Sequence, residues 1–330
     1  MPQTGSPGTW RQCRTVPGGC VGSNYTRVLL ACSMSLLSES ESPLSAAPLL
    51  RPVEAVTQTS DFRWVLRDPS GIARGVLVVT DTQLFLLSQL DGSQTRGEIQ
   101  TQFARRYGAV LPEAQLESFL GQLDRAGYLA GPGFEEFRLR HLEEYRAAPF
   151  RPLRNPDGFG AAAAHLPQYL DRLLETAPEA GALPERSGRL VGLIAPHLDF
   201  ARGAPCYAAA YRALLASWGA ERPARVVVLG TNHFGLSRSV TATWQDFQTP
   251  WGVLATDREF LERLEARSGG SLRPSEADHL QEHSIELHAV WIHHLLGPAV
   301  RLVPVLCPDP NGPLGTQPGD PAGVDLLRFA

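Results

Sequence analysis

The stretch RVVVLGTNHFG, residues 225–235, decides the fold class predicted for this chain. Its first part, RVVVLG, is a short and nearly continuous apolar run, which is the pattern of a strand buried on both faces of a parallel sheet. His233 follows this run directly. Ligands of open α/β sheets bind at the carboxyl ends of strands, so the stretch predicts a buried strand that brings a histidine to a functional edge.

Three further stretches complete the pattern. VGLIAPHLDF (191–200) places His197 at the end of a second strand-like run, and VRLVPVLCP (300–308) predicts a last strand. A helix with Pro205 at its first position and a helix over EHSIELHAVWIHHLL (282–296) lie between the strands. This order predicts an α/β domain with a central, largely parallel sheet and flanking helices.

Three histidines are candidates for one shared metal site. His197 and His233 would come from neighbouring strand ends, and His283 from a helix start with Glu282 beside it. Neutral imidazole is the commonest metal ligand, and side chains from separate elements can converge on one ion. The spacing leaves a second interpretation open, in which these are ordinary core or surface histidines.

A different grouping involves His279. HLQEH (279–283) matches the H-x-x-E-H pattern of inverted zinc peptidases, which sets two histidines on one helix face. That chemistry needs a third protein ligand, often a later glutamate, and no glutamate follows Glu286. The pair His293-His294 is expected near the helix end, where the dipole favours it.

Composition indicates an ordinary globular protein of one or two domains. The 330 residues are 43% hydrophobic and 19% charged, and the net charge of −4 gives no basic footprint for nucleic acid or an anionic membrane. No apolar run approaches the roughly 18–20 residues of a membrane span. Five cysteines without a C-x-x-C pair favour a reducing, cytoplasmic setting, with Cys206 and Cys307 expected to be buried. Nucleotide and serine-hydrolase motifs are absent.

The residues ahead of 191 divide into three parts. Residues 1–50 lack periodicity and are expected to be a disordered extension, within which Met34 is an alternative start. Residues 51–144 predict a small module with a hairpin near 68–71 and three short helices, the second opened by a Thr95–Glu98 capping box. Residues 145–190 are interpreted as a linker, with one helix, that begins the α/β domain of residues 145–330.

LDGSQTRGEI and LDRAGYL, within about residues 60–135, resemble the PqqD-like winged-helix domain. The resemblance implies recognition of a peptide for a modifying enzyme. A winged helix used only for packing or dimerisation is the alternative. DNA binding is not expected, because no basic recognition helix is present.

APHLDFARG, VVVLGTNH, TPWGVLATD, EHSIELH and VRLVPVL, in this order over about residues 150–308, resemble the Memo-like family. Its bacterial members are called AmmeMemoRadiSam system protein B, and the family is similar in fold to class III extradiol dioxygenases, which hold non-haem iron. The resemblance implies that His197, His233 and His283 line a metal pocket, the first two as direct ligands. It also implies that the C-terminal part of the domain is missing.

The resemblance implies a bacterial Memo-like protein with one iron or copper ion and dioxygenase-like oxidoreductase activity, and the cysteine pattern favours the cytoplasm. His283 and Glu282 would be the catalytic acid/base groups beside the ion. The expected partners are a radical-SAM enzyme, an AMMECR1-like protein and a peptide ligand. The competing hypothesis is a non-catalytic protein that binds a peptide or another ligand through the winged-helix module and the histidine-lined pocket.

Overall fold

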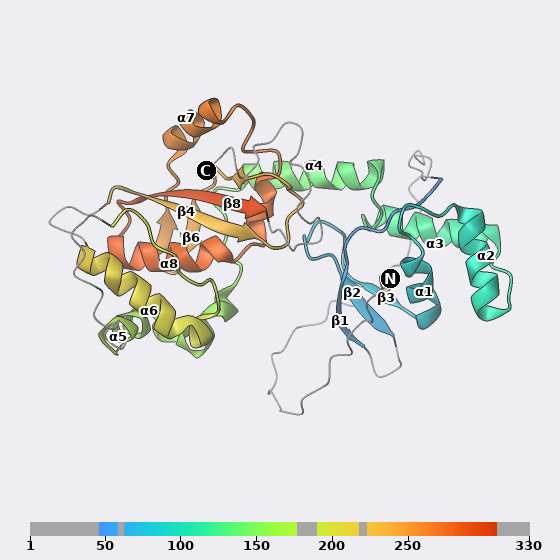
Figure 1. Cartoon of the computed structure of the whole chain (residues 1–330), viewed down its shortest axis with the longest axis horizontal. Coiled ribbons are helices and arrows are strands. Elements are labelled where there is room, and N and C mark those ends of the chain that lie inside the picture. The colour runs from blue at the N-terminus through green and yellow to red at the C-terminus, as the bar shows by residue number, and fades with distance from the viewer. Residues whose placement is uncertain (1–45, 59–62, 177–189, 218–222, 309–330) are drawn as a thin grey trace, which may run out of the picture. The chain divides into compact units, whose positions relative to one another are not determined.

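The computed structural model describes residues 46–58, 63–176, 190–217 and 223–308, which form a mixed α/β protein with small sheets (Figure 1). The strands are β1 Glu54–Gln58, β2 Trp64–Arg67, β3 Leu77–Val79, β4 Arg225–Asn232, β5 Thr241–Ala242, β6 Phe247–Thr249, β7 Gly252–Leu254 and β8 Arg301–Pro308. The α-helices are α1 Asp81–Ser88, α2 Arg96–Tyr107, α3 Glu113–Arg125, α4 Pro132–Ala147, α5 Leu166–Thr176, α6 Phe200–Ser217, α7 Arg258–Ser268 and α8 Ser284–Leu296. Two 3-10 helices are η1 Pro156–His165 and η2 Glu276–Leu280. None of the described helices combines the length and apolar character that a membrane crossing requires.

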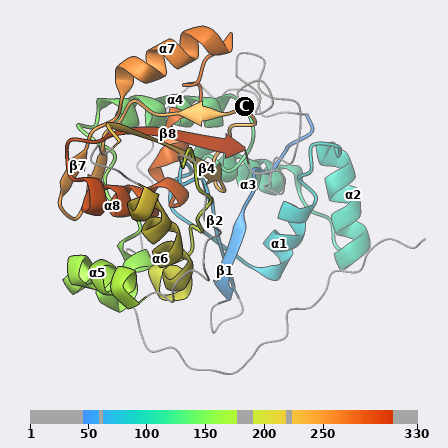
Figure 2. The same cartoon turned by 60° about the vertical axis from the view of Figure 1, so that its left-hand side comes forward.

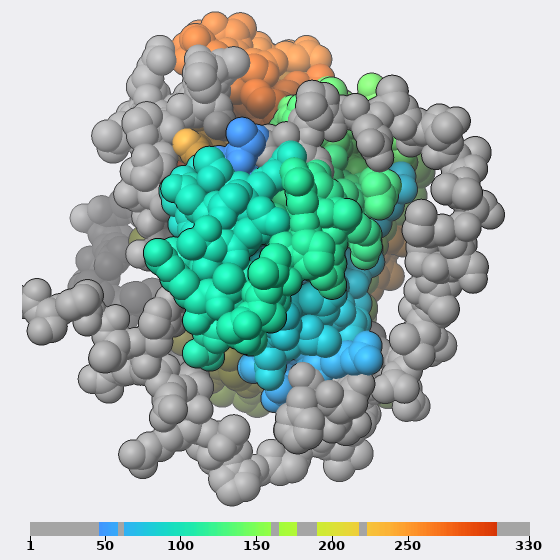
Figure 3. All heavy atoms as spheres, turned by 90° about the vertical axis from the view of Figure 1, so that its right-hand side faces the viewer, coloured from blue at the N-terminus to red at the C-terminus, as the bar shows by residue number. Residues whose placement is uncertain are grey.

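The N-terminal module consists of an antiparallel sheet in the order β1-β2-β3 and the helices α1, α2 and α3. The predicted capping box is confirmed, because the Thr95 hydroxyl accepts the Glu98 N–H while Glu98 accepts the Thr95 N–H. Helix α3 buries one apolar stripe, formed by Leu116, Leu120 and Leu123. Figure 3 looks onto this module, where α2 and α3 form much of the coloured surface.

Residues 1–45 lie outside the described residues, and the expected disorder does not extend through residue 50. Leu49 and Leu50 form bridges with Asp91 and Leu129. The Leu50 N–H donates to the Leu90 carbonyl, and the Ala130 N–H donates to the Leu49 carbonyl. The ordered chain therefore enters the module ahead of residue 51.

Helix α4 crosses the predicted boundary between residues 144 and 145. Near its start, the Arg51 guanidinium lies over the Phe134 ring, 3.6 Å from the centroid. Near its end, the Tyr145 hydroxyl lies 2.9 Å from Thr243 Oγ1, and Arg146 forms an ion pair with buried Glu276. One continuous helix thus contacts residues on both sides of the predicted boundary.

The sheet that positions the candidate site has the order β4-β8-β5. The predicted parallel pairing is confirmed for β4 and β8, whose register runs from Arg225–Arg301 to Asn232–Pro308. β5 pairs with β8 in the antiparallel sense over Thr241 and Ala242, so this described sheet is mixed, with the longer pairing parallel. After β4 the chain turns back, and the short β5 pairs with the edge of β8 that β4 does not occupy. β5 therefore runs opposite to both β4 and β8.

Helix α8 lies between this sheet and helices α5 and α6 (Figures 1 and 2). Ile285, Ala289 and Ile292 pack against the sheet residues Leu302 and Leu306. On its other side, Leu287, Val290 and Trp291 pack in one cluster with residues of α5 and α6. Because both faces are covered, most residues of α8 are buried, including the polar Ser284, Glu286 and His293.

The prediction that β4 is buried on both faces is wrong. Val226 and Val228 pack toward the α8 side, but Val227 and Leu229 are 48% and 58% exposed. The cluster on the opposite side of the sheet contains β8 residues Val303 and Val305 and no β4 residue. β8 occupies the middle of the described sheet, whereas β4 is an edge strand with one uncovered face.

The strand predicted ahead of His197 is not formed. Residues 190–199 have no regular secondary structure and pair with no described strand, and Ile194 is fully exposed. A strand exists only where its backbone groups find a partner, which an apolar sequence alone does not supply. The predicted start of the next helix is also wrong, since α6 begins at Phe200 and contains Pro205. Cys206, expected to be buried, is exposed.

Candidate metal centre

The structure brings His197, His233 and His283 together. Each offers one ring nitrogen, and these atoms all lie within 4.8 Å of one another. The Nε2 atoms of His197 and His233 are 3.3 Å apart. The ring centroids of His233 and His283 are 5.1 Å apart, and the two rings are nearly parallel. All three side chains are half-buried, so their rings are partly removed from water but can still be reached from solvent.

Gly230 allows the start of α8 to approach β4. A Cβ atom at this position would lie 2.6 Å from both Ile285 Cγ1 and Ser284 Oγ, which no real side chain tolerates. Ser284 Oγ accepts the Thr231 N–H and donates to the Thr231 carbonyl, each at 3.0 Å. A glycine inside a strand often marks such a close approach. The consequence is that His283, just before α8, lies beside His233, just after β4.

Glu282 holds His233 in place. Its carboxylate accepts the His233 N–H at 2.8 Å and lies 3.1 Å from His233 Nδ1. It also accepts the N–H groups of His283 and Ser284, at 2.8 and 2.9 Å. An ionised carboxylate at Nδ1 fixes the tautomer with the hydrogen on Nδ1, which leaves the Nε2 lone pair for the cluster.

The pKa of Glu282 reflects these bonds. Burial alone would raise it, but the hydrogen bonds from the His233 ring and from the backbone N–H groups of Ser284 and His233 outweigh burial and lower the pKa to about 2. The carboxylate is therefore ionised at neutral pH with its acceptor positions occupied. This geometry favours a positioning role for Glu282 over the acid/base role expected from the sequence.

The segment that carries His197 is held by side chains instead of a sheet. The Tyr207 hydroxyl donates to the Leu198 carbonyl at 3.0 Å. On the other side of His197, the Pro196 backbone opposes the lowering of the His288 pKa by burial, which places the His288 ring near it. The Tyr211 hydroxyl lies 2.8 Å from His288 Nδ1. The Tyr207 bond thus ties the peptide after His197 to α6.

The histidines of this region favour the neutral form. Burial lowers the pKa of His197, and the neighbouring His233 and His283 lower it further. Burial also lowers the pKa of His283, and the effect exceeds the opposing attraction of Glu282. Burial, with a smaller contribution from His197, lowers the pKa of His288 to about 4. Neutral imidazole is the form that binds metal ions.

This donor set fits a single transition-metal ion. Imidazole nitrogens bind such ions at about 2.0–2.1 Å, which places neighbouring ligand nitrogens roughly 3–4 Å apart. The 3.3 Å between the His197 and His233 Nε2 atoms lies in this range. A carboxylate behind one ligand, as Glu282 is behind His233, is the usual outer support of a metal-bound histidine.

The other candidate residues lie elsewhere. His279 is in η2, buried, with Nε2 3.2 Å from the Thr241 carbonyl, so it does not share a helix face with His283 as the zinc-peptidase pattern requires. Cys307 pairs in register with Thr231, and burial raises the pKa of its thiol. His293 and His294 lie in the last turn of α8, as predicted. The supporting residues that were not predicted are Gly230, Ser284, Tyr207, Tyr211 and His288; of these, only the glycine carries a recognisable signal, its place inside a strand.

The comparisons with known proteins agree on one family. Residues 154–310 match the family model described as Memo-like protein. A MEMO1 family protein of Aquifex aeolicus is 27% identical over 245 residues, which cover 74% of this chain and 62% of that protein. A MEMO1 family protein of Thermus thermophilus is 30% identical over 217 residues, which cover 64% of this chain and 62% of that protein. A MEMO1 family protein of Methanopyrus kandleri is 36% identical over 129 residues, which cover 38% of this chain and 44% of that protein.

The chain therefore spans less than two thirds of the length of these relatives. The match to the Aquifex protein is longer than residues 154–330, so the similarity extends ahead of residue 154. Residues 154–310 are thus similar to Memo-like proteins, and this similarity is consistent with the dioxygenase-like fold predicted for the α/β part.

Proposed function

We propose that the protein binds one iron or copper ion through His197, His233 and His283. The observation that carries the proposal is the convergence of three imidazole nitrogens within 4.8 Å from separate parts of the chain. The fixed tautomer of His233 and the lowered pKa values of His197 and His283 support it, because they present neutral ligands at neutral pH.

The three histidines leave coordination positions for water, oxygen or a substrate, so we further propose an oxidoreductase. The bound ion would supply electron transfer and polarisation of a ligand, and imidazole suits both iron and copper. The chain's own groups orient the site: Glu282 holds His233, while Tyr207 holds the backbone beside His197. The His283 ring also lies beside Glu282, with Nδ1 3.3 Å from Oε1, and we assign His283 as the third ligand.

The direct test is metal analysis by mass spectrometry of protein purified without a metal-chelating tag. We expect about one iron or copper ion per chain, and loss of the ion in His197→Ala and His283→Ala. His294→Ala is the matched control, because His294 also pairs with a carboxylate, Asp171, outside the cluster. Unchanged metal content in His197→Ala would refute the site, provided that circular dichroism shows an intact fold.

The oxidoreductase proposal needs a separate measurement. Metal-dependent oxygen uptake by the loaded protein, absent in His197→Ala, would support it. A protein that holds the ion but consumes no oxygen with any reductant tested would favour the competing hypothesis, in which the pocket binds a ligand without turnover.

A further inference from the structure

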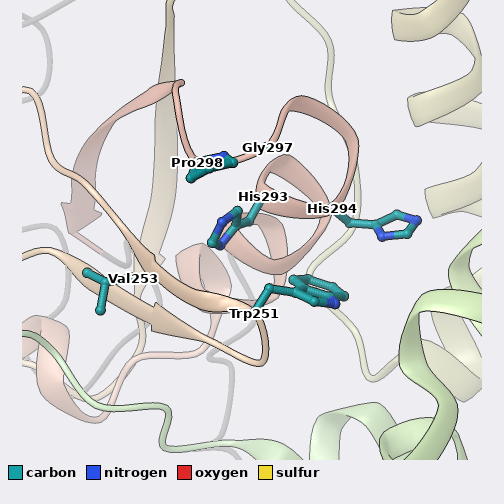
Figure 4. A pocket seen from close by; sticks show the side chains of 6 residues that line it. All are labelled: Trp251, Val253, His293, His294, Gly297 and Pro298. Carbon is teal, nitrogen blue, oxygen red and sulfur yellow. The ribbon is translucent and has the colours of Figure 1, made fainter.

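A second pocket lies at the opposite end of α8. It has a volume of about 350 Å³ and is lined by Trp251, Val253, His293, His294, Gly297 and Pro298 (Figure 4). His293 follows His283 by ten residues, which is about 15 Å along the helix axis. The pocket is therefore separate from the three-histidine cluster, and the proposed metal does not use it.

The chemistry of the pocket depends on His293, which is 6% exposed. Its Nδ1 lies 2.6 Å from Thr249 Oγ1. The Thr249 hydroxyl also donates to the Gly252 carbonyl and accepts the Trp251 N–H. A hydroxyl has one hydrogen and two acceptor positions, so all three bonds form together only if His293 Nδ1 carries the proton. Nε2 then has a free lone pair.

The lining selects a neutral ligand. Among the described residues, the lining contains no carboxylate, guanidinium or ammonium group. Burial lowers the pKa of His293, which keeps its ring uncharged. A metal is a poor occupant, because His293 and His294 are adjacent on a helix and do not face the same point. In Figure 4 the two rings point in different directions, and His294 pairs with Asp171.

The apolar part of the lining suits a flat ring. The Trp251 indole, the Val253 side chain and Pro298 provide aromatic and aliphatic surface beside the rings of His293 and His294. Small-molecule sites combine apolar surface with a few placed polar groups, and their volumes begin at about 300 Å³. Aromatic ligands gain from contact with the indole face beyond the area that they bury.

We propose that this pocket binds a small neutral aromatic molecule with one O–H or N–H donor, which donates to His293 Nε2 while the ring contacts Trp251. Phenol is the simplest probe of this chemistry. Anisole is the matched probe, because it keeps the ring and the oxygen but has no hydrogen to donate.

The test is ligand-observed NMR titration of the full chain with each probe. Phenol should bind about fivefold more tightly than anisole, the effect of one hydrogen bond. In His293→Leu this preference should disappear. Val253→Phe should fill the pocket and abolish phenol binding without touching His293, since Val253 is only partly buried, at 39% exposure. Val227→Phe places the same side chain on the exposed face of β4 and should change nothing.

Phenol binding should also persist in His197→Ala, which separates this pocket from the proposed metal site. Equal binding of phenol and anisole by the unaltered protein, no binding of either, or unchanged binding in Val253→Phe would each overturn the proposal. The Val253→Phe arm keeps the test decisive if His293→Leu fails to fold.

Discussion

Replacement of Glu282 by glutamine separates the positioning of His233 from the simple presence of three histidines. Glutamine keeps the shape of the side chain but replaces one carboxylate oxygen by an NH₂ group. Oε1 accepts the N–H groups of His283 and Ser284, so the amide oxygen is best placed there. The NH₂ group then replaces Oε2 and faces the His233 backbone N–H and ring.

Two effects follow from this geometry. The NH₂ group can donate to His233 Nδ1 and so favours the tautomer that carries its hydrogen on Nε2, which removes the lone pair needed by an ion. Loss of such outer support typically weakens metal affinity about 10–100-fold. The His233 N–H also loses its acceptor, and an unsatisfied buried donor costs about 1–3 kcal/mol of unfolding free energy.

The assay is competition with a chromophoric chelator for zinc(II), a redox-inert ion that imidazole binds well. Glu276→Gln is the matched control, because Glu276 is equally buried and accepts charged donors from Arg146 and Arg273 away from the cluster. We expect both variants to lose stability and only Glu282→Gln to lose zinc affinity. Equal zinc affinity in Glu282→Gln and the unaltered protein would show that the carboxylate does not set the tautomer of the His233 ring.

Three further predictions concern the support of the site and the N-terminal module. Gly230→Ala should lower the unfolding free energy by about 1–3 kcal/mol in urea denaturation, because its Cβ would meet Ser284 at 2.6 Å; unaltered stability would mean that α8 moves away freely. Tyr207→Phe should weaken zinc binding several-fold without unfolding the protein, since it releases the Leu198 carbonyl, and an unchanged affinity would place the control of His197 elsewhere. Burial would raise the pKa of Asp68, but its ion pair with Arg51 and its hydrogen bonds outweigh this and lower it. The pKa of Asp68 is thus lower in the folded than in the unfolded state. The ionised carboxylate therefore stabilises the fold at pH values above the ordinary carboxyl pKa, and this stabilisation is lost as the pH falls through the lowered pKa. Melting temperature should then depend less steeply on acid pH in Asp68→Asn, and parallel curves would contradict this.

The sequence pattern was sufficient to predict that His233 and His283 lie close together. His233 follows a strand that pairs in parallel with β8, and His283 precedes the helix that packs on the same sheet, so both arise at one edge. Apolar runs and strand ends are local features, and the topology of parallel strands converts them into proximity. The capping box at Thr95 was predictable for the same reason, because all its bonds lie within four residues.

Features that depend on distant partners could not be predicted. Residues 191–197 have the composition of a strand but lack a described strand to pair with. Val227 and Leu229 have the composition of core residues but lie on an uncovered face. The role of Glu282 depends on the backbone turn ahead of α8, which points its carboxylate at His233. Neighbourhood in sequence suggested a pairing of Glu282 with His283, whose Nδ1 lies 3.3 Å from the carboxylate, but it gave no sign that the same carboxylate also contacts the His233 ring.

Arg151 shows that the boundary of a family match is not the boundary of a folding unit. This arginine is completely buried and forms an ion pair with Glu286 of α8. It also donates to the carbonyls of His279 and Glu282, at 2.7 and 2.6 Å, directly ahead of His283. The family match begins at residue 154, so a fragment cut there would leave the Glu286 carboxylate buried without its partner, a loss of about 3–5 kcal/mol. Independent expression of the α/β part should therefore begin ahead of Arg151, and evolutionary shuffling at residue 154 would separate a charge from the helix that depends on it.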